Sequence, residues 1–99
     1  MKLTIEQAIE QGISAHKEGN LEAADRIYRD ILQSKLSNPE VNHNLGQVAL
    51  FVNKIDAALP LFEKALIGHP KMERFRISYI DALIKANLLK SAKRAIKNA

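Results

Sequence analysis

Apolar residues recur every three or four positions along most of the chain, which is the spacing of helices with one buried face. The pattern also repeats, because small, large and turn-forming residues return after 34 positions in three separate registers. These registers hold Ala24, Ala58 and Ala92; Tyr28, Phe62 and Ile96; and Gly19, Asn53 and Asn87. Glycine and asparagine readily adopt the left-handed conformation that ends a helix. A repeat of this length predicts a helical solenoid.

The same pattern predicts six helices joined by short turns, and local signals place several of their ends. Thr4 and Gln7 fit a capping box before the first helix, and Asn38 fits the cap of the third. Gly68 should end the fourth helix in a left-handed conformation, and Pro60 should bend that helix. The predicted helices cover about 5–17, 21–32, 39–52, 55–67, 71–86 and 88 onward.

Composition narrows the class of protein without changing this picture. The chain has 99 residues, 46% of them hydrophobic, and no cysteine, which excludes disulfides and thiolate metal sites. Carboxylates at Glu6 and Glu10 argue against a signal peptide, and the longest uncharged run, 41–53, is too short to cross a bilayer. We therefore expect one small helical domain, 1–99, located in the cytoplasm and not in a membrane.

The repeat resembles that of tetratricopeptide repeat (TPR) proteins, in which each unit is a hairpin of helices A and B. The middle repeat carries the family's leucine–glycine pair, two alanines, aromatic residue and closing proline at Leu45, Gly46, Ala58, Ala65, Phe62 and Pro70. The resemblance implies an all-α, right-handed solenoid of about three hairpins, at 5–38, 39–72 and 73–99, with the third incomplete. The family's tryptophan is absent, and Tyr79-Ile80 replaces the leucine–glycine pair in the third repeat.

The choice of small and large residues within this repeat predicts how the helices pack. Gly46 should let its two helices approach closely, whereas Phe62 and Tyr28 should fill the gap between successive hairpins. No repeat of this kind buries its apolar faces alone, so stability should come from stacking.

A second resemblance concerns the start of the chain. The segments 3–8 and 42–46 look like the N-terminal repeats of bacterial multidomain transferases of the glycosyltransferase or sulfotransferase type. On that basis we expect the chain to be part of such a protein or a shortened relative of one. The repeat motif itself predicts fold more specifically than function.

The TPR resemblance implies a binding surface for a protein or peptide on the concave side, which the A helices line. The candidate binding residues carried over in this way are His16, Lys17, His43, Asn44, Gln47, Phe51, Arg74, Asp81 and Lys85. The family's clamp for a C-terminal carboxylate uses five places, here occupied by Ile9, Ile13, Asn44, Arg74 and Ser78. Only Asn44 and the charge of Arg74 fit, so we do not expect a carboxylate clamp.

Charge is concentrated at one end and suggests an alternative function. Residues 71–99 contain eight Lys or Arg and two Asp or Glu, a balance of +6. This segment could bind nucleic acid or another polyanion. However, its basic residues are not interleaved with the stacking aromatics of single-strand binders, which makes nucleic acid the less favoured partner. A steep salt dependence of oligonucleotide binding would distinguish the two functions.

Candidate chemistry is sparse. His16, His43 and His69 are the possible metal ligands, but His16 and His43 should lie about 10 Å apart in height along parallel helices, at 1.5 Å per residue. All three are predicted to be surface histidines. No serine lies in a nucleophile motif and no glycine-rich phosphate loop is present. The sequence therefore predicts no enzyme, no metal and no cofactor.

We expect the C-terminal end of the array to lack the extra helix that usually caps such solenoids. Five apolar residues should be partly bare there, and they are Ile80, Leu83, Ile84, Leu88 and Ile96. An apolar patch of this kind usually marks an interface. We expect a homodimer through this patch, with association that tightens as salt screens the surrounding positive charge.

Overall fold

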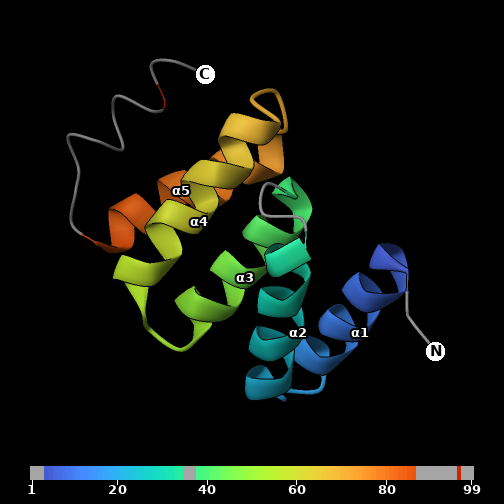
Figure 1. The fold of residues 1–99 in the computed structure, drawn as a ribbon. Coiled ribbons are helices and arrows are strands. Elements are labelled where there is room, and N and C mark those ends of the chain that lie inside the picture. The colour runs from blue at the N-terminus through green and yellow to red at the C-terminus, as the bar shows by residue number, and fades with distance from the viewer. Residues whose placement is uncertain (1–3, 35–37, 87–95, 97–99) are drawn as a thin grey trace.

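The computed structural model describes residues 4–34, 38–86 and 96, and this part of the chain is all-α (Figure 1). Its helices are α1 (Ile5–Lys17), α2 (Leu21–Ser34), α3 (Pro39–Phe51), α4 (Ile55–Gly68) and α5 (Glu73–Lys85). The predicted fold class is confirmed for the first five helices. The predicted sixth helix, from 88 onward, lies outside the described residues. Among the described helices, none is long and apolar enough to cross a membrane.

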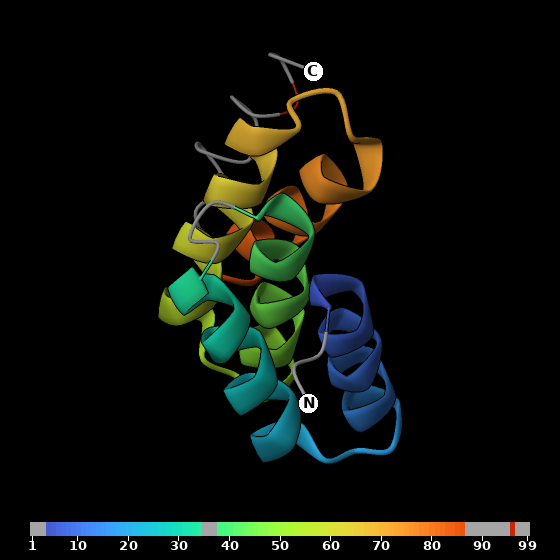
Figure 2. The same cartoon turned by 45° about the vertical axis from the view of Figure 1, so that its right-hand side comes forward.

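The helices form two successive antiparallel hairpins, α1–α2 and α3–α4, followed by α5 (Figure 1). Each helix packs against the next along the chain, and α3 also contacts both α1 and α5. The three A helices α1, α3 and α5 are therefore neighbours, with α3 in the middle (Figure 2). Each has 13 residues, and each starts 34 residues after the previous one.

Most of the predicted end signals are confirmed. The Thr4 hydroxyl accepts a bond from the Gln7 amide at 3.1 Å, and the Thr4 amide donates to the Gln7 side chain at 2.9 Å. The Asn38 side chain accepts from the Val41 amide at 3.1 Å. Gly19 and Asn53 have φ angles of 81° and 64°, so both turns use the left-handed conformation that the sequence predicts.

The prediction for Gly68 is wrong, because this glycine is the last residue of α4 and does not have a positive φ. Its role is steric. A Cβ atom at Gly68 would lie 2.5 Å from Cγ of Pro39, the first residue of α3. The missing side chain therefore lets the end of α4 approach the start of α3. The fifth helix also begins later than predicted, at Glu73, after Met72 in an extended conformation.

The core of each hairpin is an aromatic ring lying against a glycine of the partner helix. A Cβ atom at Gly46 would be 2.7 Å from Cε1 of Phe62, and one at Gly12 would be 2.4 Å from Cε1 of Tyr28. Phe62 and Tyr28 are both almost completely buried. Tyr28 also shares a core cluster with Val41 and Leu45 of α3, and Phe62 shares one with Ala82 of α5, so each ring packs within its own hairpin and against the next repeat, as predicted. The close approach predicted at Gly46 is present.

The contact between Gly46 and Phe62 can be tested by the sign of one substitution. In an unobstructed helix, replacing glycine with alanine raises stability by about 1 kcal/mol. At Gly46 we expect Gly46→Ala to lower the free energy of unfolding by roughly 1–3 kcal/mol, because the new methyl group overlaps the Phe62 ring. Urea denaturation monitored by circular dichroism measures this change.

A double-mutant cycle provides the control. In a Phe62→Leu background the ring is gone, so Gly46→Ala should cost less or become stabilising, with a coupling of about 1 kcal/mol or more. Two strictly additive effects, or a stabilising Gly46→Ala in the parent, would show that this contact does not set the helix spacing.

Candidate functional site

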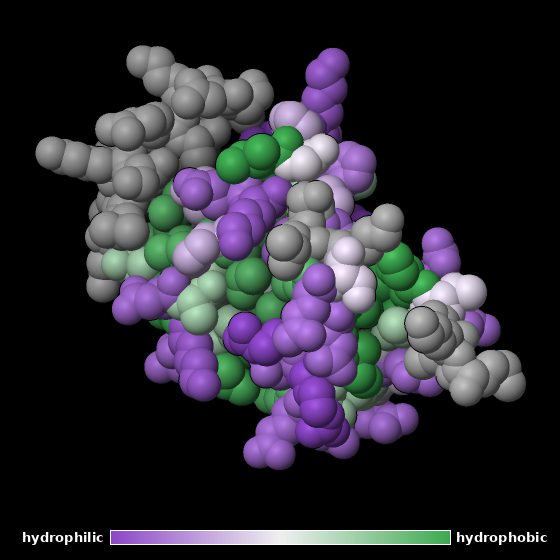
Figure 3. All heavy atoms as spheres, viewed as in Figure 1, coloured by the Kyte–Doolittle hydropathy of each residue, from purple (hydrophilic) through white to green (hydrophobic). Residues whose placement is uncertain are grey.

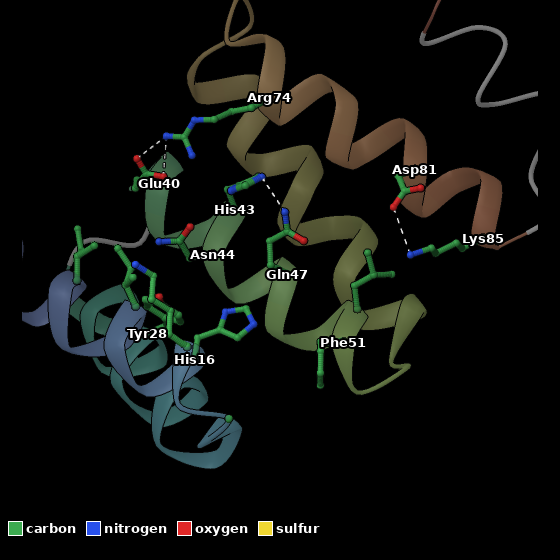
Figure 4. Close-up of a pocket in the computed structure, with 15 residues that line it drawn as sticks. His16, Tyr28, Glu40, His43, Asn44, Gln47, Phe51, Arg74, Asp81 and Lys85 are labelled. Carbon is green, nitrogen blue, oxygen red and sulfur yellow. Dashed lines mark hydrogen bonds and ion pairs between the residues drawn. The ribbon is translucent and has the colours of Figure 1, made fainter.

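An open groove of about 950 Å³ runs across the A helices α1, α3 and α5. All nine residues predicted to bind a partner line it, namely His16, Lys17, His43, Asn44, Gln47, Phe51, Arg74, Asp81 and Lys85 (Figure 4). The repeat period thus brings together side chains that are up to 69 positions apart in the sequence. The structure places them in one groove, and their binding role stays a prediction.

His43 is the residue whose prediction is most clearly wrong. It is only 5% exposed, whereas the sequence predicts a surface histidine. Its ring stacks on Phe75 of α5, with the centroids 4.7 Å apart, and lies 5.6 Å from the ring of Phe62. The His43 Nε2 atom is 2.8 Å from the Ser78 hydroxyl, and the Gln47 amide donates to the same hydroxyl at 3.2 Å. His43 therefore joins the second hairpin to α5.

Burial determines the charge of His43. Desolvation is the largest effect and lowers the pKa of the imidazole below its usual value; Asn44 and the charge of Glu40 raise the pKa, the charge of Arg74 lowers it, and the net shift is downward. The Nδ1 atom is buried and has no hydrogen-bond partner among the described residues. Because a protonated ring would have to bury an uncompensated N–H and a charge, the neutral form is favoured at this position.

The other two histidines differ from His43. His16 is half-buried, and its ring meets that of Phe51 edge to face at 6.2 Å. His69 is exposed in the turn after α4, as predicted. Within the part of the chain that the structure describes, no group of three histidine, aspartate or glutamate side chains could hold a metal ion.

Two ion pairs neutralise most of the charge in the groove. One guanidinium nitrogen of Arg74 donates to both carboxylate oxygens of Glu40, at 2.7 and 2.9 Å. Glu40 and Arg74 occupy the same place in successive A helices, 34 positions apart, so this pair ties α3 to α5. Lys85 lies 3.3 Å from Asp81 one turn away on α5. Lys17 has no carboxylate within 4.0 Å among the described residues.

The apolar part of the groove contains an aromatic residue that the fold leaves unprotected. Phe51, the last residue of α3, is 73% exposed. Ile9 and Ile13 of α1 also line the groove. Compared with this apolar part of the groove, the face seen in Figure 3 is more polar: polar side chains predominate on it, and apolar side chains appear mainly between them. An exposed phenylalanine in a concave surface is a candidate anchor point for a ligand.

Sequence reasoning missed three residues that line the groove, which are Gly19, Tyr28 and Leu50. Tyr28 belongs to α2, a B helix, and reaches the groove because Gly12 of α1 leaves room for its ring. Burial raises the pKa of Tyr28 to about 12. The available signal was the repeat itself, because Gly12 and Tyr28 lie 34 positions before Gly46 and Phe62.

The places of the family's carboxylate clamp do not form an anion site here. Ile9 and Ile13 are apolar, Arg74 is paired with Glu40, and the Ser78 hydroxyl is shared by His43 and Gln47. The polyanion alternative stays a prediction. Of the four described basic residues in 71–99, Arg74 and Lys85 are ion-paired, whereas Lys71 and Arg76 have no ion pair with a described residue; Lys90, Lys93, Arg94 and Lys97 lie outside the described residues.

The predicted self-association patch requires a correction. Leu83 is only 4% exposed, so it is part of the core and not bare. Ile84 is 47% exposed and Ile96 57% exposed, while Ile80 is half-buried. Leu88 lies outside the described residues. The exposed apolar surface at this end therefore centres on Ile84 and excludes Leu83.

Comparison with known proteins identifies solved structures with the same fold. The chain matches a structure of MamA AMB-1 with a TM-score of 0.82 and 26% identity, over 91% of this chain and 49% of that one. It matches a structure of MamA MSR-1 with a TM-score of 0.83 and 24% identity, over 96% and 55%. No protein-family model and no curated protein sequence matches the chain.

These matches support a TPR-type helical solenoid, the fold that the sequence predicts. The chain spans about half the length of the two solved structures. Neither match involves a transferase or a nucleic-acid-binding protein, so the predicted relation to transferases stays a prediction.

His43 should make stability depend on pH. The pKa of His43 is lower in the folded state than in the unfolded state, where a histidine has an ordinary pKa of about 6.5. The unfolded state therefore binds more protons as pH falls through this range. The stabilisation is therefore present above about pH 6.5 and is lost as pH falls toward the lowered folded pKa. Urea denaturation at pH 7.5 and 5.5 should show a loss in the parent that is smaller in His43→Gln. The control His16→Gln should retain the parent's loss, and an equal loss in all three would contradict the assignment.

Ile84 gives a sharper test of self-association than Leu83. If copies associate through the C-terminal end, sedimentation at micromolar concentration in moderate salt should show a species heavier than the 11.1 kDa chain. Ile84→Glu should abolish it, because a charge would be buried in the contact. Ile67→Glu, at a 73% exposed position of α4, is the matched control. A single 11.1 kDa species in the parent would rule out the dimer.

Proposed function

We propose that this chain is a non-catalytic interaction module that binds a peptide segment of a partner protein in the groove across α1, α3 and α5. The observation that carries the proposal is the convergence of side chains from all three A helices on one open groove, with Phe51 exposed in it. An aromatic side chain held on a rigid helix is the kind of residue that dominates binding energy in protein interfaces. The TPR-type fold of the matched structures agrees with such a role.

The arrangement of His43 and Ser78 raises an enzymatic alternative, because a serine within hydrogen-bond distance of a histidine can act as a nucleophile. Three observations argue against it. His43 is buried between two aromatic rings, and its Nδ1 has no orienting partner among the described residues. The groove carboxylates Glu40 and Asp81 are committed to Arg74 and Lys85. The dyad therefore lacks the third group of a catalytic triad, and its contacts explain it as a link between hairpins.

The groove also suits a chain better than a small molecule. Its floor is built by successive helices, so contacts recur along its length instead of converging on one enclosed point. Its two ion pairs are satisfied within the protein, leaving apolar surface and one unpaired lysine for a ligand. Extended peptides meet these requirements because they present side chains at regular intervals.

Selection from a displayed library of random 12-residue peptides tests this function. Peptides that bind the parent should bind Phe51→Ala at least tenfold more weakly, since truncating an anchor costs more than about 1 kcal/mol. Fluorescence anisotropy with the selected peptides measures the affinity. Circular dichroism should show unchanged helicity, because Phe51 is exposed.

Ile67→Ala is the matched control, since Ile67 is also 73% exposed but belongs to α4 and does not line the groove. Its affinity for the selected peptides should equal that of the parent. Failure to enrich any peptide, or equal losses in both variants, would rule out the groove as the binding site.

A further inference from the structure

The three A helices end on an unusual set of side chains. Lys17, Phe51 and Lys85 are the last residues of α1, α3 and α5, 34 positions apart, and all three line the groove. We propose, on the basis of the proposed function, that this end of the groove selects a peptide segment in which one large apolar residue lies between two acidic residues. The apolar residue would contact Phe51, and each acidic residue would meet one of the lysines.

The order of the helices places Phe51 between the two lysines. α3 contacts both α1 and α5, and it is the middle of the three A helices (Figure 2). Packed helices have axes about 8–10 Å apart where they are closest, so about 16–20 Å is the minimum separation of the ends of α1 and α5. A lysine, a phenylalanine and a second lysine therefore succeed one another across the groove.

The charge of the groove is uneven along the helices. Glu40 and Arg74 lie in the first turns of α3 and α5, where their bidentate pair is internally neutral. At the opposite ends, Lys17 has no carboxylate partner among the described residues, and Lys85 has only Asp81. That second pair is weak, because both side chains are about half exposed, at 53% and 52%. Among the residues that line this end of the groove, Lys17, Lys85 and Asp81 therefore leave an excess of one positive charge.

Helix electrostatics explains only part of this pattern. A lysine at the last position of a helix is favoured by the helix dipole, which accounts for Lys17 and Lys85. It does not account for Phe51, which puts an exposed aromatic ring where the other two helices have a cation, and α3 has no basic residue in its last turn. The edge of the His16 ring lies against Phe51 at 6.2 Å and gives the aromatic surface a polar border.

These distances define the ligand. A chain in the polyproline II conformation has three residues per turn and advances about 3.1 Å per residue, so residues three positions apart share a face and two acidic residues six positions apart span about 19 Å. The fitting probe is a nine-residue peptide with phenylalanine at its centre and aspartate three positions to either side. Because this probe is symmetric, the test does not depend on the direction in which a peptide lies in the groove.

Fluorescence anisotropy with the labelled probe tests the selectivity, using the full chain at low salt. We expect binding that weakens about fivefold when both aspartates are replaced by lysine, and about fivefold or more when phenylalanine is replaced by serine. Lys17→Glu should weaken binding of the aspartate probe. It should also improve binding of a probe with lysine at one of the two positions, whereas Lys64→Glu on α4 should do neither.

The outcomes separate this inference from the proposed function. Equal binding of the aspartate and lysine probes, with loss only in Phe51→Ala, would overturn the acidic selectivity and leave the peptide groove intact. Weaker binding of the aspartate probe to Lys64→Glu and Lys17→Glu alike would reduce the effect to net charge and also overturn the inference. If the displayed-peptide selection yields no binder, the proposed function itself fails.

Discussion

The contact between an aromatic ring and a bare glycine backbone determines how each hairpin is built. Phe62 against Gly46, and Tyr28 against Gly12, fix the distance between the A and B helices more tightly than two ordinary side chains would allow. These contacts turn the glycine-bearing face of α1 toward α2 and that of α3 toward α4. The groove depends on that rotation, because the A-helix residues not used against the B helices become its lining. The same glycine–aromatic contacts therefore determine both the packing within the hairpins and the groove that crosses them.

The fold and the groove were readable from the sequence because both follow from periodicity. A period of 34 residues defines which positions are equivalent in successive repeats, and equivalent positions on parallel helices line the same face. Together with the resemblance to TPR proteins, which implies that the A helices line the concave face, this allowed nine residues from three helices to be assigned to one groove without a structure. The pairing of Glu40 with Arg74 belongs to the same logic, since the two residues are one full repeat apart.

The errors concern contacts that periodicity does not determine. His43 is buried because Phe75 and Ser78 approach it from α5, and the residues near His43 in the sequence do not predict these two contacts. Leu83 was expected to be bare because the array was predicted to lack a capping helix, yet it is buried. Gly68 was predicted to adopt a left-handed conformation, whereas its observed role is to leave room for Pro39 of α3. For His43 and Gly68 the deciding atoms lie on another helix, at a distance set by three-dimensional packing.

The polar links between α3 and α5 are distributed unevenly along these helices. The Glu40–Arg74 pair joins their N-terminal ends, and the contacts of Ser78 with His43 and Gln47 join their middles. At the C-terminal ends, the described side chains form no hydrogen bond or ion pair between the two helices. Because polar contacts hold α3 and α5 together at their N-terminal ends and middles, the two helices can separate most easily at their C-terminal ends. The width of the groove should consequently vary near Phe51 and stay constant near Glu40, so that the surface adjusts to partners of different thickness without repacking its core.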